Sequence, residues 1–310
     1  LEASKYSAAS SKLVAEKGAF EGSLDAIDEA DCVITIGEDL ISYHEVISFM
    51  VKRKLNGGTK LVCIDTDDST YGNLATSTVV IKEGTEKSIV KGLIAGMVKL
   101  GLKSCDCESC KNPDEVLQNT AETSGVSSET ILDAAYAIGT STNPVILFGE
   151  PVASDPEANA LFPIHCMAEM LDACIINAKG KANSLAASQF GLTDEYETAD
   201  TVIAVMADEE CEGWAEVIAP ADTKILFASY ENEMTQDADV VFPVCNWAQE
   251  QGHFVNLEGK IQWRSQLVNA DEQVKSTPEA LYLLAKELDI TIAGDWKEAL
   301  TAEPASVLIQ

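Results

Sequence analysis

Short apolar runs recur along the chain and are separated by longer stretches of mixed polarity. The first runs lie within residues 29–37, 57–65 and 78–81 and contain many Val, Ile and Thr residues without regular polar alternation. Strands of a parallel sheet that is covered by helices on both faces have this pattern. We therefore predict a strand in each run.

A second set of apolar runs repeats features of the first set. These runs lie at 198–206, 221–229 and 238–243. The first shares an Ala-Asp step with residues 29–37, the second shares a Thr-Lys start with residues 57–65, and the third lies at a similar distance downstream as residues 78–81. Such repetition indicates duplication of a supersecondary unit.

The stretches between the runs contain helical patterns. Residues 86–100 carry an apolar stripe, 278–288 begin with a proline, and 127–138 begin with Ser127, a typical N-cap, before a strand at 144–148. Alternating strands and helices indicate an α/β protein with doubly wound parallel sheets. We expect two Rossmann-like domains, at residues 1–140 and 141–310.

Three further segments have a less regular pattern. Residues 104–124 are polar and are expected to form an insertion or connector. Residues 180–192, rich in Gly, Asn, Ser and Ala, are expected to form a loop at a cleft. Residues 164–176 are expected to form a helix that carries His165 and Cys166 in its first turn. A nucleophile next to a base would need a third orienting group, so the core interpretation of Cys166 is favoured.

Composition limits the possible partners. The chain has 310 residues, 46% of them hydrophobic, which is enough for a substantial core. With 51 acidic and 21 basic residues its net charge is -30, which disfavours binding to nucleic acid or to an anionic membrane. Solubility in a salty cytoplasm and a basic partner subunit both remain open as explanations of this charge.

The remaining composition points to a reducing compartment. No apolar run approaches the ~18 residues that span a bilayer, and the first residues lack the apolar core of a signal peptide. Nine cysteines, an odd number scattered through the apparent strands and helices, are typical of reduced core thiols. We expect a cytoplasmic protein without direct membrane insertion.

Two short segments of the chain bear on dinucleotide and metal binding. A dinucleotide-binding fingerprint needs several closely spaced glycines after the first strand, but Gly37 stands alone before two carboxylates. Cys105, Cys107 and Cys110 form a compact cluster that could bind zinc or anchor an iron-sulfur cluster if a fourth ligand is supplied. A metal site, a local disulfide and inert thiols all remain open for this cluster.

The segment 238–262 carries the most specific pattern in the chain. It resembles a signature of molybdopterin oxidoreductases, with His253 in place of the usual Thr; the matching residues are Ala238, Asp239, Pro243, Glu250, Gly252, Phe254, Asn256, Glu258, Gly259 and Gln262. Residues 29–37 and 81–86 resemble two further motifs of the same family, in the expected order.

The resemblance implies a fold and a set of cofactor positions. The fold is the pair of Rossmann-like α/β domains found in formate dehydrogenase. The implied pterin-cleft positions follow the strands or lie in the signature: Gly37, Asp65, Thr66, Gly84, Gly149, Asn256, Glu258 and Gln262.

Departures from the family pattern argue against cofactor binding. The family's Asp-Pro-Arg after the second strand is replaced by residues 65–68, Asp-Thr-Asp-Asp, and its Gly-Glu-Asn-Pro by residues 207–210, Ala-Asp-Glu-Glu. Lys260 replaces the usual Arg. These changes remove a cation and add carboxylates where phosphates would bind. We therefore expect vestigial cofactor positions, no catalytic residue and no cofactor in this chain.

The large peripheral-arm subunit of complex I shares both the signature and the loss of molybdenum chemistry. The resemblance therefore implies a non-catalytic module of an NADH-linked complex, a scaffold for electron transfer through iron-sulfur clusters in an upstream region. Its partners would be the other subunits, which would hold it at the periphery of the inner membrane. One alternative is a fragment of a molybdenum or tungsten enzyme such as formate dehydrogenase, with molybdopterin guanine dinucleotide. The other is a metal-binding regulatory module that uses the cysteine cluster.

Overall fold

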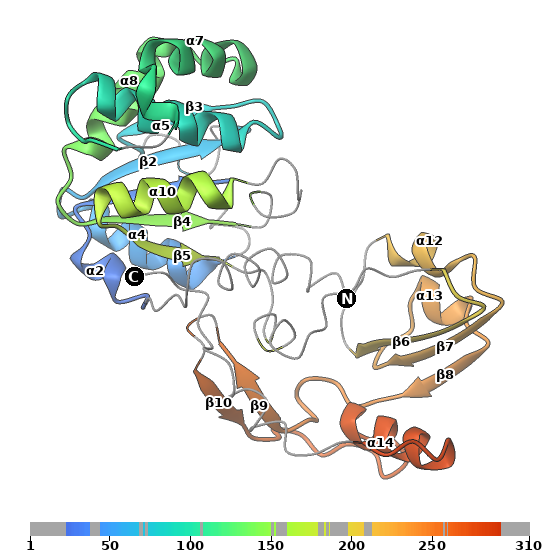
Figure 1. Ribbon diagram of the computed structural model, residues 1–310. Helices are drawn as coiled ribbons and strands as arrows, with labels where there is room; N and C mark the ends of the chain where they lie inside the picture. Colours follow the sequence, from blue (N-terminus) through green and yellow to red (C-terminus); the bar gives the residue numbers. More distant parts are fainter. Residues whose placement is uncertain are drawn as a thin grey trace. The chain divides into compact units, whose positions relative to one another are not determined.

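The structure is a computed structural model. It describes residues 23–37, 44–67, 71, 74–105, 108–149, 152, 160–178, 183, 186, 198–207, 213–256, 258 and 260–292. The chain forms two compact units (Figure 1): unit 1 is Leu1–Asp194 with Val255–Lys260 and Ala299–Gln310, and unit 2 is Glu195–Phe254 with Ile261–Glu298.

Unit 1 is built around a five-stranded parallel sheet. Its strands lie in the order β3-β2-β1-β4-β5, with β1 at Cys32–Ile36, β2 at Lys60–Asp65, β3 at Ser77–Val80, β4 at Pro144–Phe148 and β5 at Cys174–Asn177. The strands predicted in the first three apolar runs and at 144–148 are confirmed. β1 pairs with β2 on one side and with β4 on the other. The chain therefore extends the sheet from β1 to β3 in one direction and then from β4 to β5 in the opposite direction, with the switch between β1 and β4.

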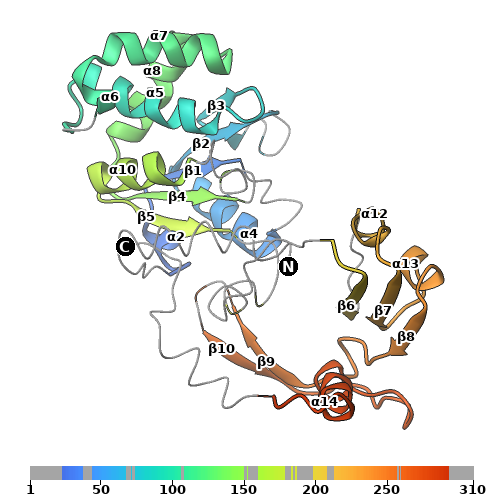
Figure 2. The same cartoon turned by 45° about the vertical axis from the view of Figure 1, so that its right-hand side comes forward.

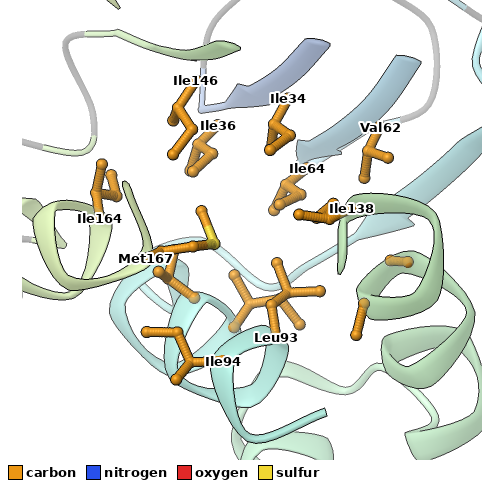
Figure 3. Packing of buried hydrophobic residues seen from close by; sticks show 14 of the residues in the cluster. Ile34, Ile36, Val62, Ile64, Leu93, Ile94, Ile138, Ile146, Ile164 and Met167 are labelled. Carbon is orange, nitrogen blue, oxygen red and sulfur yellow. The ribbon is translucent and has the colours of Figure 1, made fainter. Parts of the chain in front are cut away.

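Helices cover both faces of this sheet (Figure 2). On one face, α2 (Ala26–Glu29) and α4 (Glu45–Leu55) pack Ile27, Ile47 and Val51 against alternate strand residues. On the other, α5 (Glu86–Lys99), α8 (Ser128–Gly139) and α10 (Leu161–Leu171) pack against Ile34 and its neighbours, and Figure 3 shows this larger core. Coverage of both faces explains why the strand residues do not alternate with polar ones.

The helix α8 begins as its sequence predicts. The Ser127 hydroxyl accepts a hydrogen bond from the Thr130 amide at 3.1 Å, which satisfies one of the otherwise unpaired N–H groups of the first turn. The predicted helices at 86–100 and 278–288 are also present, as α5 and α14 (Thr277–Glu287).

The segment 104–124, expected to be an insertion or connector, is largely helical. The segment contains α6 (Glu108–Lys111) and α7 (Pro113–Ser124), and α7 ends at Gly125, whose φ of 78° is left-handed. Only Leu117, Thr120 and Ser124 of α7 are buried. The helix therefore needs only a narrow contact surface, and most of its sequence is polar because it faces solvent.

The expectation of one helix over 164–176 was wrong in its second part. The helix α10 ends at Leu171, Asp172 takes a left-handed φ of 55°, and Cys174 begins β5. The residues Cys-Ile-Ile-Asn are too few to show a period, so pairing with β4 decides their conformation.

Unit 2 contains a smaller parallel sheet in the order β6-β7-β8. Its strands are β6 (Thr201–Ala207), β7 (Thr223–Ala228) and β8 (Val240–Pro243), as the repeated apolar runs predicted. The short helices α12 (Trp214–Ile218) and α13 (Glu233–Gln236) enclose a small core with one face of this sheet. A two-stranded sheet of β9 (Gly252–Val255) and β10 (Ile261–Arg264) and the helix α14 follow.

The division between the units lies away from the domain boundary expected near residue 140. That boundary would separate α8 from β4, whereas β4 pairs with β1 along its full length and β5 pairs with β4. The residues up to Asp194 therefore belong to unit 1. Unit 2 has a parallel sheet whose small core lies on the face of Val202, Met206 and Leu226, and Phe227 of the middle strand is buried on the opposite face.

Candidate functional site

The carboxyl edge of the unit 1 sheet brings several predicted positions together. Ile36 pairs with both Ile64 and Phe148, so Gly37, Asp65 and Gly149 follow three aligned residues. The Gly37 amide donates to the Ile64 carbonyl at 2.9 Å, and the Gly149 amide donates to the Ile36 carbonyl at 3.3 Å. This edge between β1 and β4 is where open α/β sheets hold ligands.

Gly37 has the backbone conformation that requires glycine. Its φ is 56°, in the left-handed region where a Cβ is unfavourable. Its counterpart in unit 2, at the end of β6, is Ala207, with a φ of 49°. The two units therefore share a left-handed residue at the end of their first strand.

The second strand ends in a carboxylate. The Asp65 side chain accepts a hydrogen bond from the Thr66 amide at 2.7 Å. The Thr66 N–H group at this edge is therefore already used by a carboxylate of the chain. Asp67 adds a second acidic residue. In the described part of the chain, the residues that directly follow β1, β2, β4 and β5 include no Lys or Arg.

One polar residue at this edge was missed by the sequence analysis. Asn177, the last residue of β5, pairs in register with Phe148 and is only 3% exposed. A polar side chain at the end of the run Cys-Ile-Ile-Asn was the available signal. It was overlooked because that run was assigned to a helix.

Gly84 also follows a strand at the carboxyl edge, because β3 is parallel to β2 and its last residue, Val80, pairs with Asp65. It forms part of the turn between β3 and α5, with a φ of 76° and no atom within 4 Å of the Cβ that another residue would place there. Gln262 is an exposed residue of β10 in unit 2.

The turn between β9 and β10 is organised by Asn256. Its side-chain oxygen accepts hydrogen bonds from the amides of Glu258 at 3.0 Å and Lys260 at 2.8 Å. The Asn256 amide in turn donates to the Lys260 carbonyl at 3.0 Å. Asn256 is therefore used to hold the turn closed.

Glu258 joins the same turn to the start of α2. One carboxylate oxygen accepts from the Ser23 hydroxyl at 2.8 Å and from the Leu24 amide at 3.0 Å, and the other accepts from Lys260 Nζ at 2.8 Å. Burial by itself raises the pKa of Glu258, but these hydrogen bonds outweigh it and lower the pKa below its usual value. The carboxylate is thus held ionised, with only 12% of the side chain exposed.

Other acidic residues of the signature also accept backbone hydrogen bonds. In unit 2, Asp239 accepts from the Lys224 amide at 2.8 Å and ties β8 to β7, while Glu250 accepts from the Thr277 amide at 2.5 Å at the start of α14. Asp239, Glu250, Asn256 and Glu258 therefore all hold distant or turning backbone segments in place. At these four positions the signature residues stabilise the fold.

The earlier Ala-Asp motif has the same kind of role. The Asp31 carboxylate accepts from the amides of Thr142 and Asn143, at 2.7 and 2.9 Å, and from the Thr142 hydroxyl at 2.8 Å. Burial raises the pKa of Asp31, but these hydrogen bonds outweigh that effect and lower the pKa. They join the beginnings of β1 and β4.

A cleft at this opposite edge of the sheet was not predicted. It has a volume of about 480 Å³ and is lined by Ser23, Asp25, Ala26, Glu29, Asn143, Asp172, Ala173 and Cys174. Carboxylates dominate its polar lining, which gives it no complementarity to an anionic cofactor.

A molybdopterin guanine dinucleotide carries phosphates, which bind to cations and to unpaired backbone N–H groups. The described edge of unit 1 offers Asp65 and Asp67 after β2, where the Thr66 amide already donates to Asp65. Lys82 follows β3, but its side chain lies against Gly125 at the end of α7. Asn256 and Glu258 are committed to the turn and to α2. The described residues at these positions do not fit this group.

The cysteine cluster remains a prediction. Cys105 and Cys110 are half-buried, and Cys107 lies outside the described residues. Among the residues that the structure describes, no group of three or more His, Cys, Asp or Glu residues could hold a metal ion.

Other cysteines lie in the core of unit 1. Burial raises the pKa of the Cys32 thiol to about 12 and that of Cys63 to about 11, so both stay protonated at neutral pH. Cys166, the candidate beside His165, packs against the main core cluster. No described helix is long and apolar enough to cross a membrane.

Comparisons with known proteins support the resemblance seen in the sequence. A family model described as molybdopterin oxidoreductase matches residues 2–286. The alpha subunit of an F420-dependent formate dehydrogenase 1 from Methanococcus maripaludis is 22% identical over 87% of this chain and 49% of its own length. An F420-dependent formate dehydrogenase alpha subunit from Methanocaldococcus jannaschii is 22% identical over 81% and 46%. The chain thus spans about half the length of these curated relatives.

Solved structures share the fold at low identity. Acetylene hydratase from Pelobacter acetylenicus aligns with a TM-score of 0.70 at 15% identity, covering 92% of this chain and 50% of the hydratase chain. A chain of the formyltransferase/hydrolase complex from Methylorubrum extorquens aligns with a TM-score of 0.57 at 13% identity, covering 92% and 82%. At these identities the likeness concerns the fold alone.

Proposed function

This chain belongs to the molybdopterin oxidoreductase family. We propose that it is the α/β portion of a formate-dehydrogenase-type subunit, and that it keeps the family's fold but does not bind the pterin dinucleotide. In this proposal unit 1 is a Rossmann-like domain and unit 2 is a reduced relative of it. The other subunits of a redox complex are the partners.

The curated relatives support the formate dehydrogenase type. Those reported above are formate dehydrogenase alpha subunits rather than complex I subunits, so they do not support the NADH-linked role that the sequence resemblance favoured. We accordingly replace the complex I assignment with this one. The proposed role as a scaffold within an electron-transfer complex is kept.

The use of the signature side chains carries the non-catalytic part of the proposal. Asn256 and Glu258 could contact a cofactor only by giving up hydrogen bonds that hold the β9–β10 turn and the start of α2. Each such loss costs about 0.5–1.5 kcal/mol, the net contribution of a typical hydrogen bond, because these bonds are part-buried or exposed. Asp65 would also face the phosphates with a like charge.

A catalytic subunit is the second candidate. The observation that favours it is the adjacency of Gly37 and Gly149 at the edge between β1 and β4. Glycine at such a position lets the backbone approach a ligand closely, and the left-handed φ of Gly37 is retained here. In this case, molybdopterin guanine dinucleotide would supply the redox chemistry.

Cofactor analysis of the natural full-length protein tests the proposal. The protein is purified without oxygen, molybdenum and tungsten are measured by mass spectrometry, and released guanine nucleotide is measured by chromatography. We expect both far below one equivalent, together with no formate-dependent reduction of a viologen dye. Stoichiometric metal with guanine nucleotide would contradict the proposal and support the catalytic candidate. A formate dehydrogenase alpha subunit purified in parallel controls for loss of cofactor.

A further inference from the structure

The connection between α4 and β2 contains a chemically reactive pair of residues. It reads Asn56-Gly57-Gly58-Thr59, and Asn56-Gly57 is the one place in the sequence where a glycine follows an asparagine. The side-chain amide of an asparagine can be attacked by the main-chain nitrogen of the next residue. Glycine hinders this attack least, because it has no side chain and its backbone is the most permissive. Among the asparagines of this chain, Asn56 therefore has the most favourable neighbour for the reaction.

The reaction converts the side-chain amide of Asn56 into a carboxylate. The Gly57 nitrogen loses its proton and forms a bond to Asn56 Cγ, the bond from Cγ to Nδ2 breaks, and ammonia leaves with that proton. The product is a five-membered succinimide ring. Water then opens the ring at one of its two carbonyl groups, which gives aspartate or isoaspartate. Water is the only co-reactant, and the reaction needs no oxidant, reductant or binding surface.

The end of α4 restrains this reaction in the folded protein. Asn56 is the C-cap of α4, with a φ of -62° and a ψ of -22°, and the Gly57 amide donates to the Lys54 carbonyl at 2.8 Å. Ring closure needs the Gly57 nitrogen to eclipse Asn56 Cβ about the Cα–C bond, and a helical ψ keeps these two atoms apart. While the last turn of α4 is formed, the attacking nitrogen is therefore misplaced and hydrogen-bonded.

This restraint is weak because it lies at a helix end. Terminal turns fray at a free-energy cost far below that of global unfolding. The hydrogen bonds to be broken are the one from Gly57 to Lys54 and one from the Gly58 amide to the Leu55 carbonyl at 3.1 Å. Two consecutive glycines then leave the connection a wide choice of conformations. The turn can thus open while the sheet of unit 1 stays intact.

Other asparagines of unit 1 are held more firmly. The Asn143 side chain donates to the Glu29 carbonyl at 2.9 Å, and the Asn256 side chain accepts from two amides of its turn. Each of these side chains must give up a hydrogen bond before it reacts. The next residue is Pro144 after Asn143, which offers no N–H group, and a leucine after Asn256. These sites therefore lack both the free side chain and the glycine that the reaction favours.

We propose that Asn56 is a modification site, at which the folded protein deamidates spontaneously when the last turn of α4 frays. The product places a carboxylate at the C-terminal end of α4, where the helix dipole disfavours negative charge. Isoaspartate also adds one main-chain atom between the Arg53–Asp28 ion pair and the start of β2, where Lys60 pairs with Cys32. Both changes act on the segment that joins α4 to the sheet. This proposal goes beyond the proposed function and does not depend on whether a cofactor binds.

Peptide mapping of the full chain tests the proposal. The protein is incubated at pH 8 in buffer and, in parallel, in concentrated urea, and samples are digested at intervals with an acid protease. Liquid chromatography with mass spectrometry separates the asparagine, aspartate and isoaspartate forms of the peptide that contains Asn56. We expect conversion in both conditions, about tenfold slower in the folded protein, which is the factor for opening one or two hydrogen bonds.

Substitutions of the two glycines should have opposite effects. Gly57→Ala adds a Cβ to the attacking residue, 3.2 Å from the Lys54 carbonyl oxygen, and should slow the conversion in both conditions. Gly58→Ala places a Cβ at a φ of 91°, which strains the closed turn. It should speed the conversion about fivefold in the folded protein and leave it unchanged in urea. The internal control is Asn269, which is followed by alanine and should stay unmodified in the folded protein.

Several results would overturn the proposal. If Asn56 stays unmodified in the folded protein while it converts in urea, only global unfolding releases it. Equal rates in the two conditions would show that the end of α4 does not restrain the reaction. Conversion of Asn269 as fast as that of Asn56, or no effect of Gly57→Ala, would show that the following glycine is not the cause. Circular dichroism of each variant confirms that it is folded in buffer.

Discussion

The Glu258 carboxylate accepts a hydrogen bond from the Ser23 hydroxyl at 2.8 Å, although the two residues are 235 positions apart in the chain. The same carboxylate oxygen accepts from the Leu24 amide, and the other oxygen accepts from Lys260. A residue of the family signature thereby joins the turn at Val255–Lys260 to the start of α2, and both segments belong to unit 1. This attachment can be tested separately from any cofactor.

Replacing Glu258 by Gln should destabilise unit 1 by about 1–3 kcal/mol, because the Ser23 and Leu24 donors lose an ionised acceptor. The measurement is urea unfolding at pH 7. Gln262→Glu is a suitable control, because Gln262 is exposed on β10 and should change the unfolding free energy by less than about 0.5 kcal/mol. Equal effects of the two variants would show that the attachment contributes nothing.

The contribution of Glu258 should depend on pH in a defined direction. Its pKa is lowered from the ordinary value of 4.5, so its stabilisation is present above that pH and is lost as the pH falls through the lower, folded-state pKa. The difference in stability between wild type and Glu258→Gln should therefore shrink below about pH 4. A difference that stays constant down to pH 2 would contradict this assignment.

The left-handed residues that end β1 and β6 should respond oppositely to substitution. Gly37→Ala places a Cβ at a φ of 56° and should cost about 1–2 kcal/mol. Ala207→Gly removes a Cβ from a φ of 49°, and after the entropy of the unfolded chain is counted it should stabilise by about 0.5 kcal/mol. Ala204→Gly, inside β6, is the control and should destabilise. Thermal unfolding of the three variants gives the signs.

Gly92 should resist a substitution that normally favours helices. In an isolated helix, Gly→Ala stabilises by about 1 kcal/mol. Here the new Cβ would lie 2.6 Å from Thr120 Cγ2, where α7 packs on α5. We expect Gly92→Ala to destabilise by about 1–3 kcal/mol. Adding Thr120→Ala should recover most of this loss, and failure to do so would place the cost elsewhere.

The Cys63 thiol should make the protein sensitive to alkaline pH. Burial raises its pKa from 9.0 to about 11, despite an opposing hydrogen bond with Thr35. A raised pKa means that the stabilisation is fully present below pH 9 and is lost as the pH rises towards 11. At pH 8 the folded thiol should therefore react with iodoacetamide about a hundredfold more slowly than in the urea-unfolded chain. Mass mapping of the alkylated cysteines measures this, and equal rates would contradict it.

The sequence by itself determined the class of the fold and the family. The strands β1, β2 and β4 are continuous apolar runs because they are buried within a sheet, and Ser127 caps its helix through contacts only three residues away. Information of this kind is local, so it can be read directly from the residues. The separated signature motifs supplied the family in the same way.

Only the tertiary structure decided what the polar residues do and where the units divide. Cys174 joins a strand because β4 lies beside it, the polar helix α7 is placed by its packing against α5, and β4 completes the first sheet instead of beginning a second. A glutamate at position 258 could line a cofactor cleft or accept a hydrogen bond from Ser23, and the residue type does not distinguish these two roles. Its role depends on a partner 235 residues away, and hydrogen bonds at that separation are set by the packing of the whole unit, which no local pattern records.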